Sequence, residues 1–294
     1  MIAGKKLNIL LHIVFIIAVI CCIFPILLVI SISFSSAESI MEYGYSLIPK
    51  EWSLESYKYI FGDYIKIVRA YGVTIFNTFF GATLSTLVMA LFSYPLSRPD
   101  FKGRKFFTFY IFFTMLFSGG TVAGYIVMTT IYHLQNTIWV MILPGVMSAW
   151  YVIVMRTFFQ TNVPFSIIES GEIDGANEYL IFFRLVMPIS LPGIATIALF
   201  QTLYYWNDWW MPLLYVTEPK LYNLQFLLQQ LMQNIQMLNE NELYRQNAGA
   251  TAAAIPSESA RMALCIIAMG PILIVYPFFQ KYFIQGLTIG SIKG

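Results

Sequence analysis

The chain alternates between long apolar runs and short polar interruptions. Six of the runs reach about the 20 residues that an α-helix needs to cross a bilayer core. They cover residues 9–30, 73–96, 106–130, 138–159, 190–215 and 261–285. We therefore predict an all-α, polytopic membrane protein with about six spans that form a single transmembrane domain over residues 1–294.

Helix-breaking residues interrupt two of these runs. Ser118-Gly119-Gly120 lies inside the third run and Pro144-Gly145 lies inside the fourth. Broken helices at membrane depth are tolerated where they line a cavity, so both breaks are candidates for the wall of a translocation path.

The polar segments outside the runs differ in character. Residues 34–72 are amphipathic and rich in aromatic side chains, which predicts a segment lying along the bilayer interface. Residues 216–259 are long, polar and rich in Gln and Asn, and residues 286–294 form a short tail. A frayed terminus is the ordinary interpretation of such a tail.

Composition agrees with a membrane protein. Hydrophobic residues make up 58% of the 294 residues and charged residues 11%, whereas about 25% of a soluble domain is charged. The three cysteines, Cys21, Cys22 and Cys265, all fall in apolar runs and do not suggest a disulfide framework.

Basic residues are concentrated on one side of the predicted membrane. If the spans alternate in direction, the N-terminus, residues 97–105, residues 162–189 and the tail share that side. It carries Lys5, Lys6, Arg98, Lys102, Arg104, Lys105, Arg156, Arg184, Lys281 and Lys293. Basic residues dense in short loops mark the cytoplasm, so we expect both termini to be cytoplasmic in the plasma membrane.

The loop 162–189 is the most polar interruption between two spans. Ser166 and Glu169 have the spacing of a capping box, which predicts a short helix. Gly175 follows as a position where the backbone can turn sharply. Pro188 and Pro192 predict a bend where the chain enters the fifth span. An ordinary helical hairpin is the alternative, but the order of acidic, glycine and apolar-proline segments favours a docking element.

These residues resemble the "EAA" loop of binding-protein-dependent ABC importer permeases. The resemblance is carried by Glu169-Ser170-Gly171, Asp174-Gly175-Ala176, Phe183, Leu185, Met187-Pro188 and Pro192. Residues 47–53 (LIPKEWS) and the tail 286–294 are similar to the carbohydrate-transporting branch, in particular to the smaller permease subunit of maltose-type systems. Residues 117–121 (FSGGT) resemble permeases for larger saccharides. Ser170-Gly171 departs from the family's Ala-Ala, which we expect to loosen the first short helix.

The resemblance implies a type I ABC importer permease that forms half of the path for a carbohydrate. Glu169, Ser170, Gly171, Asp174, Gly175 and Ala176 would then form a coupling helix seated on a cytoplasmic ATPase. The implied partners are a second homologous permease, two ATPase subunits, an extracellular solute-binding protein, a saccharide substrate and membrane lipid. No cofactor is expected in this chain, since ATP and Mg would be bound by the partner ATPase.

A polar and aromatic group near the end of the fifth span is a candidate for the translocation path. Its members are Gln201, Tyr204, Asn207 and Asp208. Aromatic faces and amide or carboxylate groups suit a saccharide, but Trp and Tyr also gather in the interfacial belt. For Trp209 and Trp210 we favour the belt.

Other function classes find little support in the sequence. No Gly-x-x-x-x-Gly-Lys-Ser/Thr motif is present. The two histidines, His12 and His133, lie in no metal-ligand cluster, and no basic stripe predicts nucleic-acid binding. We therefore expect a non-catalytic subunit and keep an ion- or proton-coupled secondary transporter as the alternative.

Overall fold

The computed structural model describes residues 2–240 and 257–291 as helices and the segments that connect them. No strand occurs in these ranges, apart from one isolated bridge between Ser35 and Trp52. The described helices therefore confirm the all-α prediction. Two compact units are present, Met1–Ile67 with Leu228–Pro271 and Val68–Leu227 with Ile272–Gly294.

The first unit holds the N-terminal helix and several short surface helices. Its elements are α1 (Ile2–Ser33), α2 (Ala37–Tyr43), α3 (Glu55–Ile60), the 3₁₀ turn η1 (Phe61–Asp63), the start of α4 (Tyr64–Ser97), most of α14 (Leu224–Glu240) and the first part of α16 (Ser257–Ser291). A buried hydrogen bond of 2.7 Å from Ser56 to Ser259 joins α3 to α16.

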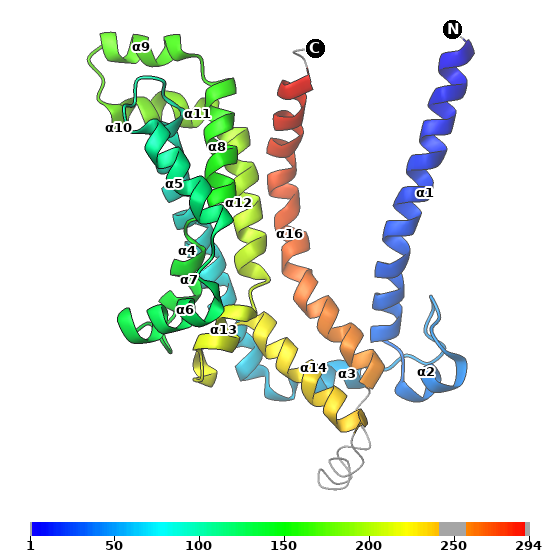
Figure 1. Ribbon diagram of the computed structural model, residues 1–294. Helices are drawn as coiled ribbons and strands as arrows, with labels where there is room; N and C mark the ends of the chain where they lie inside the picture. Colours follow the sequence, from blue (N-terminus) through cyan, green and yellow to red (C-terminus); the bar gives the residue numbers. More distant parts are fainter. Residues whose placement is uncertain (1, 241–256, 292–294) are drawn as a thin grey trace. The chain divides into compact units, whose positions relative to one another are not determined.

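The second unit carries the predicted loop and most of the predicted spans (Figure 1). Besides most of α4, it contains α5 (Arg104–Leu116), α6 (Gly120–Ile126), the π-helical turn η2 (Val127–Ile131), α7 (Trp139–Ile142), η3 (Leu143–Gly145), α8 (Ala149–Asn162), α9 (Phe165–Ile173), α10 (Glu178–Ile181), the π-helical turn η4 (Phe182–Val186), α11 (Met187–Ile189), α12 (Leu191–Trp206), α13 (Trp210–Tyr215) and η5 (Pro219–Leu221). Figure 1 shows α9, α10 and α11 at one end of this unit and α6 and α13 at the other.

Two of the predicted spans are bent rather than straight, and a third bend lies where the loop enters the fifth predicted span. The axis turns by 111° between Arg104–Leu116 and Gly120–Ile131, and by 49° between Trp139–Gly145 and Ala149–Asn162. These are the two places where glycine, serine and proline were expected to break the helix. A third bend, of 84°, separates Glu178–Ile189 from Leu191–Trp206, as the two prolines predicted.

Length and apolar composition identify the helices that are able to cross a membrane. Among the described residues two qualify, in Leu7–Ser33 and Glu55–Ser97, and up to five qualify if each bent pair is one span. The predicted sixth span falls in α16, and the side chains of residues 274, 276, 278, 279 and 281–285 lie outside the described part of the chain.

Several element boundaries differ from the sequence prediction. α4 begins at Tyr64, so the last part of the expected interfacial segment is already helical. α14 lies within the expected polar stretch. α16 extends to Ser291, so much of the expected tail continues the helix, and residues 292–294 lie outside the described residues.

Candidate functional site

The first short helix of the loop, α9, begins two residues earlier than its sequence predicted. Pro164 stands at the N-cap of α9 with extended backbone angles (φ −62°, ψ 133°), and its side chain makes no capping hydrogen bond. Ser166 is therefore inside the helix, and the expectation that it caps the helix is wrong. Ile168 and Gly171 are buried, while Glu169 and Ser170 are exposed.

The turn after α9 depends on Gly175. Its φ is +77°, in the left-handed region that disfavours side chains with a Cβ. The Gly175 N–H donates to the Glu172 carbonyl at 3.0 Å, and the Ala176 N–H donates to the Gly171 carbonyl at 2.9 Å. These two bonds form a Schellman motif, which satisfies the last carbonyls of the helix. Asp174 is the exposed C-cap residue.

The returning segment starts with a side-chain cap. The Asn177 Oδ1 atom accepts a 2.8 Å hydrogen bond from the Leu180 N–H, which starts α10. Helical geometry then continues through the π-helical turn η4 to Ile189. Ile181, Phe182 and Val186 are each at most 1% exposed and hold the segment in the core of the unit.

Gly171 sets how closely the two short helices pack. A Cβ atom at this position would lie 2.9 Å from Leu185 Cδ1 and 3.1 Å from Ile181 Cγ1. Gly171, which stands where the family pattern has alanine, therefore lets α9 pack closely against Ile181 and Leu185 of the returning segment.

Arg98 joins the loop to the end of α4. It is 5% exposed and donates to both carboxylate oxygens of Asp100, at 2.8 and 2.6 Å. It also donates to Glu172 Oε1 at 2.6 Å and to Glu178 Oε2 at 3.3 Å. Tyr94 Oη completes the cluster, since it accepts from Arg98 at 3.1 Å and donates to Glu178 at 3.0 Å.

The charges of this cluster stabilise one another. Hydrogen bonding to Asp100 raises the pKa of the Arg98 guanidinium despite the opposing effect of burial. The same hydrogen bonds lower the pKa of the Asp100 carboxyl group. From the sequence, Arg98 was expected only as one of the cytoplasmic charges. The available signal was an arginine directly after a span, on the same predicted side of the membrane as a loop with several carboxylates.

Part of the loop remains open to a partner. Glu169 and Asp174 are exposed, and within residues 7–237 their side chains form no ion pair or side-chain hydrogen bond. Ile173 is 86% exposed and Tyr179 is 73% exposed. We call these four residues the loop surface. It combines acidic and apolar groups on helices that the Arg98 cluster and the core hold in position.

The second predicted group is only partly brought together. Gln201 is 2% exposed, and its Oε1 atom has no hydrogen-bond partner among the described residues. Tyr204 is 44% exposed. Asn207 donates to the Leu203 carbonyl at 2.8 Å. Asp208 accepts from the N–H groups of residues 210 and 211, at 3.1 Å each, so it caps α13.

A tyrosine that the sequence analysis did not select lies at the centre of this region. Tyr205 is 1% exposed and donates to the Ile142 carbonyl at 2.9 Å. Cβ atoms at Gly81 and Gly145 would lie 2.7 and 2.8 Å from its ring or hydroxyl, so both glycines make room for it. Tyr205 therefore fixes α12 against α4 and against the break in the fourth predicted span.

Comparison with known proteins agrees with this architecture. Residues 78–289 match the model of the family described as "Binding-protein-dependent transport system inner membrane component". The polygalacturonan/rhamnogalacturonan transport system permease protein YtcP of Bacillus subtilis (strain 168) is 37% identical over 273 residues, which cover 93% of each chain. Protein LplC of the same strain is 36% identical over 273 residues, covering 92% of this chain and 90% of that protein.

Structural comparison gives the same result. The crystal structure of a bacterial ABC transporter involved in the import of the acidic polysaccharide alginate contains a chain that is 28% identical, with a TM-score of 0.79. The match covers 96% of this chain and 98% of that one. The fold, the matched family and the relatives together show that this chain belongs to the inner membrane components of binding-protein-dependent transport systems.

Proposed function

We propose that this chain is the permease subunit of an ABC importer for an oligosaccharide, and that the loop 162–189 couples it to a cytoplasmic ATPase. Relatives whose names specify polygalacturonan/rhamnogalacturonan and arabinooligosaccharides support a carbohydrate substrate. The comparisons give no support to a secondary transporter.

The observation that carries the coupling proposal is the exposed acidic surface on an anchored loop. Glu169 projects from a helix that Gly175 ends sharply and that Arg98 fixes to α4. A helix held in this way transmits displacement to the spans behind it, whereas a mobile loop would absorb the displacement. In the proposed complex, Glu169 pairs with a basic residue of the ATPase. Ser170, Gly171, Asp174 and Ala176 complete the coupling element around it.

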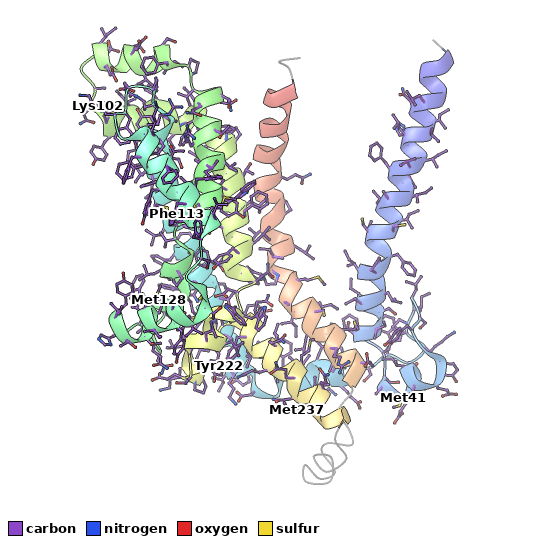
Figure 2. The ribbon with its side chains drawn as sticks, in the orientation of Figure 1. Met41, Lys102, Phe113, Met128, Tyr222 and Met237 are labelled. Atoms are coloured by element: carbon purple, nitrogen blue, oxygen red, sulfur yellow. The ribbon has the colours of Figure 1, made fainter. Side chains whose placement is uncertain are left out.

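Basic side chains support a cytoplasmic position for this loop. Arg98 and Lys102 lie in the segment that leads into α5, and Arg104 and Lys105 are the first residues of that helix. Figure 2 shows Lys102 at the same end of the unit as α9 and α10, with Met128 at the other end. Dense basic residues in a short loop favour the cytoplasmic side. Both termini are then cytoplasmic in the proposed topology.

The proposed assembly follows from the permease class. An importer of this kind requires a second permease, an ATPase that binds ATP and Mg, and a solute-binding protein outside the cell. We propose one homologous permease and two ATPase subunits as its composition, with this chain as a single non-catalytic transmembrane domain.

The proposed translocation path includes Gln201, Tyr204, Asn207 and Asp208. The exposed ring of Tyr204 supports a role in contacting saccharide, and the buried Gln201 beside it keeps an Oε1 atom without a hydrogen-bond partner among the described residues. Asn207 and Asp208 already bond backbone groups, so their contribution is to shape the turn between α12 and α13.

The coupling proposal is tested by replacing Glu169 with glutamine in the whole transporter, reconstituted in proteoliposomes. Loss of the charge should reduce saccharide uptake per ATP hydrolysed, because the ATPase contact weakens while the loop keeps its shape. Uptake and phosphate release are measured in the same preparation.

Glu38→Gln is the matched control, since Glu38 is an exposed carboxylate of α2, which belongs to the first unit and not to the unit that carries the loop. It should leave the ratio of uptake to hydrolysis unchanged. An unchanged ratio in Glu169→Gln as well would refute the docking role of Glu169.

A further inference from the structure

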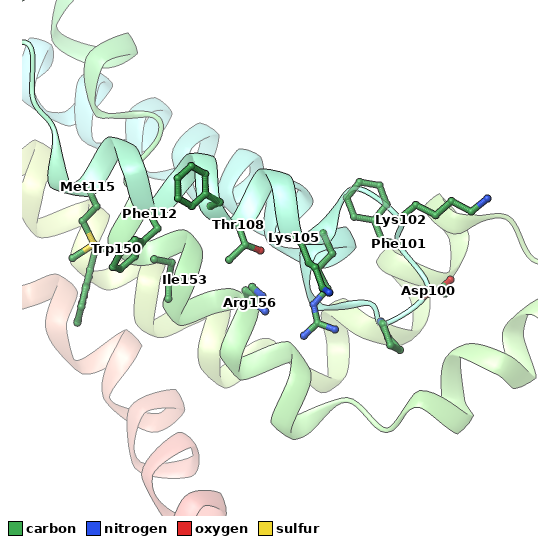
Figure 3. A pocket seen from close by; sticks show the side chains of 13 residues that line it. Asp100, Phe101, Lys102, Lys105, Thr108, Phe112, Met115, Trp150, Ile153 and Arg156 are labelled. Atoms are coloured by element: carbon green, nitrogen blue, oxygen red, sulfur yellow. The ribbon is translucent and has the colours of Figure 1, made fainter.

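A groove of about 1100 Å³ lies between α5 and α8 in the second unit (Figure 3). On α5, Lys105, Thr108, Phe112 and Met115 line it at spacings of three and four residues, which places them on one helical face. α8 contributes Trp150, Ile153 and Arg156 at spacings of three residues. The two helical faces therefore form the two walls of one continuous groove that runs along α5 and α8.

Charge is confined to one end of the groove. Lys102, Arg104, Lys105 and Arg156 line this end, and none of them forms an ion pair within the described residues. Asp100 also lines it, but both of its carboxylate oxygens accept hydrogen bonds from Arg98. The mouth therefore carries uncompensated positive charge.

The rest of the groove is apolar and open. Phe112 is 49% exposed, Met115 46% and Trp150 57%. Thr108 marks the boundary between the two regions, and its Oγ1 atom is buried with no hydrogen-bond partner among the described residues. From Thr108 to Met115 the wall rises about 10 Å at 1.5 Å per residue, which is roughly two thirds of the hydrocarbon depth of one leaflet.

We propose that this groove binds an anionic phospholipid, with its phosphate beside Lys105 and Arg156, Lys102 adding positive charge at the mouth, and one acyl chain along Phe112 and Trp150. Charge complementarity supports the headgroup position, and the apolar length supports the chain. A saccharide would need several partners for its hydroxyl groups, and apart from its basic mouth and Asp100 this groove offers the Thr108 hydroxyl and the Trp150 indole N–H. The proposal rests on the proposed function for one point, that this end of the unit lies at the cytoplasmic membrane surface.

The test is native mass spectrometry of the whole transporter in detergent, with phosphatidylglycerol or phosphatidylcholine added at equal concentrations. Lys102→Gln with Lys105→Gln should lower the bound phosphatidylglycerol at least tenfold and leave the smaller phosphatidylcholine signal unchanged. Lys50→Gln with Lys58→Gln removes the same charge from exposed positions outside the groove, and it should behave as the unmodified transporter.

A photoreactive phenylalanine analogue at position 112 identifies the occupant directly. Cross-linking to phospholipid supports the proposal. Cross-linking to another polypeptide, or equal phosphatidylglycerol retention in both double variants, would overturn it. Glu169→Gln, measured in parallel, separates the two proposals. If the groove holds no phospholipid but Glu169→Gln still lowers uptake per ATP hydrolysed, only the lipid proposal is refuted.

Discussion

Replacing Arg98 with glutamine should release the loop from the end of α4. The guanidinium bonds Glu172 of α9 at 2.6 Å and Glu178 of α10 at 3.3 Å. Hydrogen bonds to charged groups contribute about 1.5–3 kcal/mol each. The two glutamate side chains are 44% and 60% exposed, so water replaces part of the lost interaction.

We therefore expect a combined loss of about 2 kcal/mol in the free energy that keeps the loop docked. At 1.36 kcal/mol per factor of ten, this corresponds to roughly a 30-fold larger population of the detached loop. Native-state hydrogen exchange reports such local opening directly. The amides of α9 and α10 should exchange roughly 30-fold faster in Arg98→Gln.

Arg184→Gln is the matched control for this measurement. Arg184 is an exposed arginine of the same loop and forms no ion pair within the described residues. Its loss should leave exchange in α9 and α10 unchanged. Arg98→Lys keeps the charge but loses the planar fork, so it should fall between the two. The reasoning is wrong if Arg98→Gln and Arg184→Gln exchange at the same rate.

Three further predictions concern single contacts. Gly175→Ala should destabilise the loop by about 1 kcal/mol because its φ is positive, whereas Gly72→Ala, in open space within α4, should not; thermal unfolding in detergent measures both. Tyr205→Phe leaves the Ile142 carbonyl without its donor. The free energy of unfolding should therefore fall by about 1 kcal/mol, and the unfolding temperature should fall with it. An unchanged unfolding temperature would contradict the role given to that bond. Because the pKa of Asp100 is lowered, its contribution to the free energy that keeps the loop docked is complete above about pH 4. That contribution is lost as the pH falls through the lowered pKa. Asp100→Asn should remove that acid dependence of loop exchange, and a persisting dependence would assign it to other carboxylates.

The sequence predicted those features of the fold that depend on local chemistry. Gly175 lies at positive φ as expected, because a turn of this kind needs a residue without Cβ. The bends near Pro144-Gly145 and between Pro188 and Pro192 also follow from residues that cannot continue a regular helix. The prediction for Ser166 failed because Pro164, with extended backbone angles, takes the N-cap position, so α9 begins at Phe165 and Ser166 lies inside it.

The position of Arg98 after a span was visible in the sequence, but its partners were not. Arg98 and Glu172 are 74 residues apart, and Tyr205 and Ile142 are 63 residues apart. Such pairs depend on how helices pack, which no local spacing encodes. The candidate site was therefore predicted as a surface, while the contacts that anchor it came only from the structure.

The right-angled junction between α11 and α12 decides how movement passes through this chain. Because the axis of Glu178–Ile189 meets the axis of α12 at 84°, a force along Glu178–Ile189 is nearly perpendicular to α12. It has almost no component along the α12 axis. A displacement of residues 178–189 along their own helix axis therefore moves the start of α12 sideways and does not shift α12 along its axis. In the proposed transporter, a partner that draws the coupling segment along its own axis would tilt α12 across the bilayer without changing its depth.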